Sequence, residues 1–128
     1  MKTTAASARL ALLLCLGGPL SAVGLAAQQV RVEIKFGFLK GNDYLNDLSE
    51  RERGAYVMGV YDGLLGAALF GTPKRRLAWL EACGVGMGTE QVAAIVDKYL
   101  RDNPARWNEG MNVLVYSAML GACQAYRK

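Results

Sequence analysis

Two cysteines are the residues of this chain whose type and placement point most directly to chemistry. Cys83 and Cys123 are separated by a long stretch of sequence, and no Cys-x-x-Cys pair is present. The Cys-x-x-Cys spacing is typical of redox-active pairs. Because it is absent, we interpret the two cysteines as a structural disulfide. Its loop of about 41 residues would stabilise the fold by about 4 kcal/mol in the chain-entropy model. The alternatives are a redox pair and a bridge between two chains.

One acidic residue stands alone inside an apolar stretch. Asp62 is the only charged residue between positions 54 and 71. We expect it to face or flank the apolar side of a helix. A buried carboxylate then needs a partner such as an arginine or a tyrosine hydroxyl. A structural, hydrogen-bonded aspartate is favoured over a catalytic one.

The chain contains no histidine, and this narrows the possible chemistry further. This removes Ser-His-Asp and Cys-His catalysis and imidazole ligands for a metal. The sequence also shows no nucleophile motif, no cluster of metal-ligating residues and no phosphate-binding loop. We therefore predict a protein that is not an enzyme, with no catalytic residues, no cofactor and no metal.

Residues 1–26 have the pattern of a secretory signal peptide. Lys2 and Arg9 provide the positive start, and an apolar run over residues 10–16 follows. The small residues of Gly24-Leu25-Ala26 fit a cleavage site. The alternative is a membrane anchor, which is disfavoured because the run is too short to cross about 30 Å of hydrocarbon. The pattern predicts export to the periplasm.

Export changes both the charge and the cysteine count. The formal net charge of the whole chain is +4, from 15 basic and 11 acidic residues. Removal of residues 1–26 takes away two basic residues and Cys15, which leaves a net charge of +2. Because the basic excess becomes small and no aromatic-and-basic motif is present, we predict no nucleic-acid partner. An oxidising compartment also favours the disulfide.

The residues after the signal predict an extended arm over positions 27–40. Apolar and charged residues alternate along positions 29–39 with the period of a β-strand. No second strand is evident, so this arm must lie along helices, stay mobile, or pair with a second copy of the chain. The residues on the apolar side of the alternation are Val30, Val32, Ile34, Phe36 and Phe38.

Positions 41–128 have the periodicity of helices. Ser49 and Glu52 form a capping box at the start of the longest one. Apolar residues recur at helical spacing in every segment. We therefore predict an all-α fold, a small bundle of about four helices with one disulfide. After a turn at 40–43, the expected helical segments are 44–48, Glu50 to about Phe70, 74–82, Thr89 to about Arg101, and Asn103-Pro104 to about Ala125.

Small residues form two ridges on these helices. Glycine inside a helix costs about 1 kcal/mol relative to alanine, which suggests that another backbone approaches closely. We therefore expect the first and last long helices to pack at short range. The alternative for the first helix is a membrane span, disfavoured by the charge of Asp62, so we predict no stable membrane insertion. The ridges are Ala55, Gly59, Gly63, Ala67 and Ser117, Gly121, Ala125.

Lys74-Arg75-Arg76 is the densest positive cluster after the signal segment. A solvated helix start is the favoured interpretation. Positive charge opposes the helix dipole at an N-terminus, however, and this leaves room for an acidic partner. The glycine-spaced segment that begins at Cys83 is not a dinucleotide fingerprint, because no strand precedes it.

The order of several short motifs resembles the Rap/Tai family of immunity proteins. The match covers about residues 38–124, most of the chain after the signal segment. The motifs are Gly41-Asn42, Tyr56-Val57-x-Gly59-Val60-x-Asp62-Gly63, Cys83, Thr89-x-Gln91-Val92, Ile95-Val96-x-x-Tyr99-Leu100-x-x-Asn103-Pro104 and Ala118-x-x-x-Ala122-Cys123.

This resemblance implies a periplasmic, mostly helical antidote, typically a dimer, that blocks a cell-wall amidase toxin delivered by type VI secretion. We expect a cognate toxin as the partner and a homodimer as the assembly. Exposed loops on a rigid scaffold commonly carry recognition. The candidate contact residues are Gly84, Val85, Gly86, Met87, Gly88, Asp102, Asn103 and Arg106.

The alternative function is a periplasmic stress chaperone or envelope-binding protein. Such chaperones expose apolar surface when they are acidified. The lack of histidine argues against a switch near pH 6.

Overall fold

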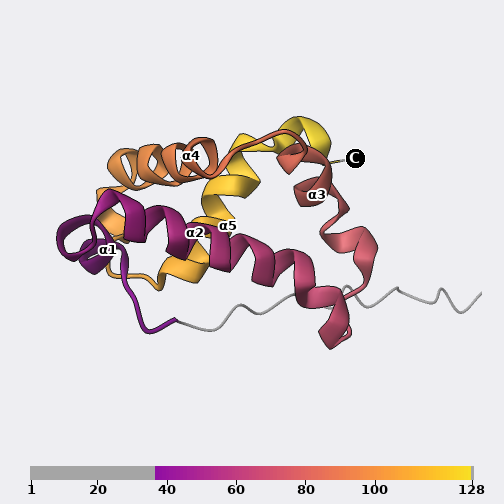
Figure 1. Ribbon diagram of the computed structural model, residues 1–128, viewed down its shortest axis with the longest axis horizontal. Coiled ribbons are helices and arrows are strands. Elements are labelled where there is room, and N and C mark those ends of the chain that lie inside the picture. The colour runs from indigo at the N-terminus through magenta and orange to yellow at the C-terminus, as the bar shows by residue number, and fades with distance from the viewer. Residues whose placement is uncertain (1–36, 128) are drawn as a thin grey trace, which may run out of the picture. The chain divides into compact units, whose positions relative to one another are not determined.

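The described part of the chain folds into five α-helices and four short 3₁₀ helices (Figure 1). The computed structural model describes residues 37–127, and no β-strand occurs among them. The all-α prediction is therefore confirmed. The α-helices are α1 (Gly41–Asp47), α2 (Glu50–Leu65), α3 (Ala78–Gly84), α4 (Thr89–Asp102) and α5 (Met111–Ala122). The 3₁₀ helices are η1 (Gly66–Phe70), η2 (Lys74–Arg76), η3 (Pro104–Arg106) and η4 (Gln124–Tyr126).

The predictions for the N-terminus fall largely outside the described residues. This holds for the signal peptide over 1–26, for Cys15 and for most of the arm over 27–40. Of the arm, only residues 37–40 are described. The side chain of Phe38 there is fully exposed. Lys40 forms a single antiparallel bridge with Gly110.

Three helices carry the core. Helices α2 and α4 lie side by side and run in opposite directions, and α5 packs against both (Figure 1). Helix α1 packs against α5, and α3 contacts η2 and η4. The core side chains have at most 6% of their surface exposed. They are Tyr44, Val57, Tyr61, Leu80, Cys83, Val92, Val96, Leu100, Met111, Leu114, Val115, Ala118, Met119 and Cys123.

Helix α4 follows its sequence pattern closely. Val92, Val96 and Leu100 are buried, with Ile95 and Tyr99 half-buried beside them. This is the apolar face that the spacing of these residues predicts. Burial of this face orients the helix, and so determines which of its polar residues face the neighbouring α2.

The capping box at the start of α2 is confirmed. The Ser49 hydroxyl accepts a hydrogen bond from the backbone N–H of Glu52, and the Ser49 backbone N–H donates to the Glu52 carboxylate at 2.8 Å. Hydrogen bonds from the Ser49 hydroxyl and backbone lower the pKa of Glu52. Because two otherwise unpaired backbone donors are satisfied reciprocally, α2 has a sharply defined first turn.

The end of the long helix differs from the prediction. The pattern predicts a helix to Phe70, whereas α2 ends at Leu65 and continues as the tighter helix η1. Gly71 then reverses the chain at φ +90°, a conformation that favours glycine. The predicted stop at Gly71 is therefore correct, but the last turn before it has 3₁₀ geometry.

The expected helix over 74–82 is split into η2 and α3. Leu77 lies between them with φ −116° and ψ 3°. The indole N–H of Trp79 donates to the Arg76 carbonyl at 2.9 Å, so this oxygen has a side-chain partner in place of the backbone N–H of Leu80. That backbone N–H bonds to Leu77. The break thus follows from a local competition for one carbonyl.

Helix α4 begins at Thr89 as predicted, whereas the predicted start of the last helix was wrong. Helix α4 is capped by Gly88, whose carbonyl accepts from Val92, and Thr89 is the first helical residue with no capping bond. Helix α5 begins at Met111, not at Asn103. The carbonyl of Trp107 accepts from Asn42 of α1 at 3.0 Å, which interrupts a continuous helical ladder.

The two ridges of small residues do not pack together. A side chain added at Gly59, Gly63 or Gly121 would meet nothing within 4 Å. Ala122 near the end of α5 is exposed, whereas Met119 is fully buried. The helices α2 and α5 meet through larger side chains instead, so the interpretation of the glycines as sites of close approach was wrong.

Replacement of Gly59 by alanine should therefore stabilise the protein. Alanine has the better helix propensity, and the position has open space around it. We expect the free energy of unfolding to rise by up to about 1 kcal/mol in chemical denaturation. A loss of stability would instead show that another backbone approaches this face.

Among residues 37–127, no helix has both the length and the apolar character needed to cross a membrane.

Candidate functional site

A disulfide joins the third helix to the end of the fifth. Cys83 and Cys123 are bonded, with their Cα atoms 5.8 Å apart, and both side chains are buried. The predicted intramolecular pairing is confirmed. It anchors the segment that enters the 84–88 loop, the first of the two loops predicted to contact a partner.

A tyrosine of α2 packs against the start of the 84–88 loop. The buried hydroxyl of Tyr61 donates to the Leu80 carbonyl at 2.8 Å. A side chain at Gly84 would overlap this hydroxyl, so the loop backbone lies directly against the ring. A turn bond from Met87 to the Gly84 carbonyl and a left-handed Gly86 with φ +82° complete the loop.

This loop presents one apolar side chain to solvent. Val85 has 80% of its surface exposed, whereas Met87 packs against the core. The loop is therefore fixed at both ends and projects Val85 outward. Gly88 ends the loop as the N-cap of α4.

The second predicted contact loop uses its polar residues internally. Asp102 pairs with Lys98 at 2.7 Å on the surface. The Asn103 side chain donates to the Tyr99 carbonyl at 2.8 Å and closes the end of α4. These two residues therefore finish a helix, and an exposed surface pair such as Asp102–Lys98 contributes little to stability.

Arg106 ties three segments together. Its guanidinium binds both carboxylate oxygens of Glu109, at 2.6 and 2.7 Å, and also contacts the hydroxyls of Tyr99 and Ser117. The hydrogen bonds to Glu109 raise the pKa of Arg106, and those from Arg106 lower the pKa of Glu109. A third of the Arg106 side chain stays exposed.

The Arg106–Glu109 pair predicts a pH dependence of stability. Because the pKa of folded Glu109 is depressed, its contribution is complete above its ordinary pKa and is lost as the pH falls through the folded value. We expect Glu109→Gln to lower the free energy of unfolding at pH 7 by about 0.5–1 kcal/mol. The variant and the parent should converge in acid denaturation. A difference in the free energy of unfolding between the two proteins that does not change with pH would contradict this prediction.

The two predicted contact loops lie at opposite ends of α4. This helix has 14 residues, so the loops are separated by about 20 Å along its axis. The structure does not bring them together into a single site. A partner that touched both would have to lie along the whole helix.

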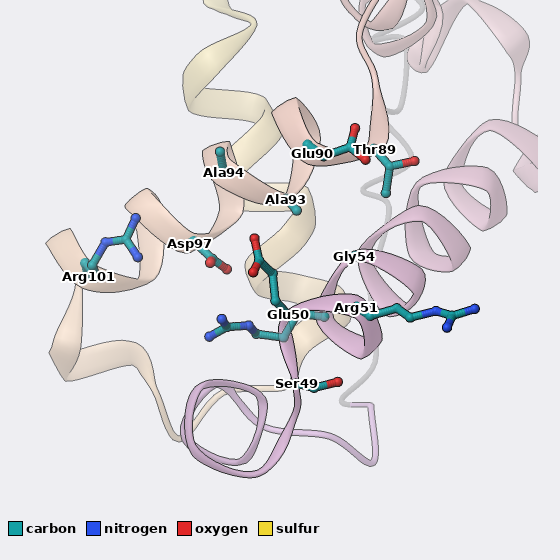
Figure 2. Close-up of a pocket in the computed structure, with 11 residues that line it drawn as sticks. Ser49, Glu50, Arg51, Gly54, Thr89, Glu90, Ala93, Ala94, Asp97 and Arg101 are labelled. Carbon is teal, nitrogen blue, oxygen red and sulfur yellow. The ribbon is translucent and has the colours of Figure 1, made fainter.

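The structure shows a cleft that the sequence interpretation missed, between the first turns of α2 and one face of α4 (Figure 2). Its volume is about 650 Å³, and none of the predicted contact residues lines it. Glu50 and Asp97 extend into the space between the helices, whereas Arg51 points away (Figure 2). The cleft is lined by Ser49, Glu50, Arg51, Arg53, Gly54, Thr89, Glu90, Ala93, Ala94, Asp97 and Arg101.

The floor of the cleft is a small polar cluster around a buried tyrosine. The Tyr44 hydroxyl donates to the Asp97 carboxylate at 2.9 Å, and Arg53 lies over the Tyr44 ring at 5.9 Å. Burial first, and then the bond to Asp97, raise the pKa of Tyr44 well above its ordinary value. The Arg53 Nε atom is buried without a hydrogen-bond partner among the described residues. The sequence signal for this cluster was weak, because its residues come from three helices.

Asp62 does not occupy a buried position. It is exposed on α2, one residue beyond the buried Tyr61. Asp62 therefore flanks the apolar side, one of the two expected placements, and only the expectation of a buried carboxylate was wrong. Its place on the helix is one step outside the apolar face.

Comparison of the chain with known proteins gives no match. No protein family, curated protein or solved structure matches it. Within the described part of the chain, no three cysteine, aspartate or glutamate side chains are grouped to hold a metal ion.

Proposed function

We propose that this chain is a periplasmic immunity protein that binds and inhibits a cognate type VI secretion toxin, a peptidoglycan amidase. The motifs that resemble the Rap/Tai family support this proposal. The observation that carries it is the fixed 84–88 loop, which projects the 80% exposed side chain of Val85. A homodimer, which the resemblance implies, stays a prediction.

The geometry of the loop suits protein recognition. Affinity is lost when a flexible loop must become ordered on binding, and a loop that is already rigid avoids that loss. Here the disulfide at Cys83 and the Tyr61 ring beneath Gly84 hold the backbone in place. An apolar side chain held outward can then fill a pocket in the partner, as the central residues of interfaces do.

Inhibition by such a loop needs no chemistry from the antidote. The loop enters the substrate cleft of the toxin and excludes the peptidoglycan strand. The surrounding surface excludes water and adds shape complementarity. The end of α4 with Arg106 lies about 20 Å from this loop and so belongs outside the central contact.

Co-expression in a bacterial host tests the proposal. The toxin encoded beside this chain is exported to the periplasm with and without the protein, and survival of the cells is measured. We expect the protein to prevent lysis. Lysis at the same rate in its presence would contradict the proposal.

A matched pair of variants tests the role of the loop. Val85→Ser removes the exposed apolar side chain of the loop, and Leu69→Ser removes one of similar size and exposure on η1. We expect only Val85→Ser to weaken protection, with affinity for the toxin reduced about tenfold, as suits the loss of a buried valine. Equal protection by both variants would exclude the loop as the contact.

A stress chaperone is the second candidate, and exposed apolar side chains favour it. Leu69 and Phe70 have 86% and 89% of their surface exposed. Such surface can hold an unfolding protein. Suppression of aggregation at low pH, measured by light scattering with an unrelated client protein, would support this candidate. Aggregation at an unchanged rate would exclude it.

A further inference from the structure

The tip formed by residues 69–76 combines exposed apolar side chains with a cluster of positive charge, and the proposed antidote function uses neither. Leu69 and Phe70 end the 3₁₀ helix η1, and Lys74, Arg75 and Arg76 form η2 a few residues later. We refer to residues 69–76 as the tip. Leu69 and Phe70 are its apolar part, and Lys74, Arg75 and Arg76 are its basic part.

The apolar part of the tip is held outward by its backbone. Gly71 takes a left-handed conformation with φ +90°, and its N–H bonds to the Ala68 carbonyl. The N–H of Thr72 bonds to Ala67 at 3.1 Å. These bonds fix the turn directly after Leu69 and Phe70, whose side chains are among the most exposed large apolar groups of the described residues. Neighbouring exposed apolar residues of this size indicate a contact surface.

The basic part of the tip has no internal counter-charge. Residues 66–80 contain no aspartate or glutamate. Across residues 37–127, the ion pairs are Lys98–Asp102 and Arg106–Glu109, so none involves the tip. Lys74 and Arg75 are exposed, and Arg76 is half-buried. Glu81 is the nearest acid further along the chain and lines a small hollow with Lys74.

We propose that the tip docks the protein on an anionic phospholipid surface. Leu69 and Phe70 enter the boundary between headgroups and acyl chains, and the three cations pair with headgroup phosphates. This combination of an apolar wedge with adjacent basic residues is how peripheral proteins bind charged bilayers. The contact is peripheral, because no described helix is long and apolar enough to cross a membrane.

A lipid surface fits the tip better than a folded partner does. A stable protein interface buries about 800 Å² on each side with close shape complementarity. The tip offers an exposed pair of apolar side chains and long basic side chains, which suit a fluid surface that adapts to them. Charge complementarity also favours phosphates, because none of the three cations forms an ion pair within residues 37–127.

Vesicle binding tests this docking. The full chain, as recovered from expressing cells, is mixed with vesicles of phosphatidylglycerol and phosphatidylcholine in equal parts, or of phosphatidylcholine alone. Mass spectrometry of the intact proteins establishes that the parent chain and all variants begin at the same residue. We expect sedimentation with the anionic vesicles at least about tenfold stronger than with neutral ones, and weaker as salt is raised.

Variants of the tip separate its two contributions. The triple change Lys74→Gln, Arg75→Gln and Arg76→Gln should lower affinity for anionic vesicles on the order of a hundredfold. The pair Leu69→Ser and Phe70→Ser should lower it about tenfold. Two controls lie outside the tip: Val85→Ser and Lys98→Gln should bind as the parent chain does.

Two outcomes would overturn the docking proposal. One is binding that ignores both vesicle charge and the tip variants. The other is that the tip variants bind vesicles as the parent does but change either self-association, measured by sedimentation velocity, or affinity for the toxin. The tip would then be a protein interface. The proposal does not depend on the antidote function, because Val85→Ser affects protection and the tip variants affect lipid binding.

Discussion

Replacement of both Cys83 and Cys123 by serine is expected to lower the free energy of unfolding by about 4 kcal/mol. The disulfide closes a segment with a sequence separation of 40 that contains α4 and α5. Without it the unfolded chain regains the entropy of that loop, which is the main source of stabilisation in the chain-entropy model. Small domains have total stabilities of about 5–15 kcal/mol, so the effect is large.

Urea denaturation followed by circular dichroism measures this change. The control is the parent protein under reducing conditions, which should show the same midpoint as the double variant. A loss below about 1 kcal/mol would show that the bond contributes little. The variant should also protect cells less well, because the segment entering the 84–88 loop is no longer tied to the end of α5.

Tyr44→Ala is expected to destabilise the fold by about 3–5 kcal/mol, as deletion of a large buried aromatic side chain does. The ring is fully buried and packs edge-on against Tyr56, with centroids 6.4 Å apart. Arg53 covers the ring, and the hydroxyl holds Asp97 at the floor of the cleft. Loss of this side chain removes the contact that joins α1 to α2 and α4.

Tyr44→Phe separates the ring from its hydroxyl. We expect a loss of about 1 kcal/mol, since only the bond to Asp97 disappears. Tyr126→Ala is the matched control, because its side chain is half exposed at the other end of the chain, and it should change stability very little. Equal effects of Tyr44→Ala and Tyr126→Ala in thermal denaturation would contradict the role assigned to the buried tyrosine.

The parts of the fold that depend on local pattern could be predicted from the sequence. The apolar spacing of Val92, Val96 and Leu100 defines α4, and the Ser49–Glu52 box defines the start of α2. The cysteine pairing followed because only two cysteines lie beyond residue 26. Each of these features is encoded within a few turns of helix or by a simple count.

The features that were missed depend on contacts between distant segments. The start of α5 is displaced because the Trp107 carbonyl bonds to Asn42, sixty-five positions earlier in the chain. Gly59 and Gly63 look like packing positions in the sequence, but their side of α2 faces solvent. Helical periodicity shows which face is apolar, and it does not show which neighbour covers that face.

The candidate site illustrates the same division. The 84–88 loop could be recognised from its glycines and from the cysteine before it. Its rigidity could not, because that depends on Tyr61 reaching from α2 to the Leu80 carbonyl. The α2–α4 cleft gave no local signal, since Arg53 and Asp97 come to the same place only when the helices pack around Tyr44, which contacts both.

Titration of the purified toxin with this protein tests the central proposal most directly. The quantity measured is the rate at which the proposed toxin, sought among the neighbouring reading frames, cleaves amide bonds in isolated peptidoglycan. We predict that cleavage falls to zero at molar equivalence, and that Val85→Ser shifts the titration to higher concentration. Undiminished cleavage in the presence of a large molar excess of the folded, disulfide-bonded protein would contradict the proposal.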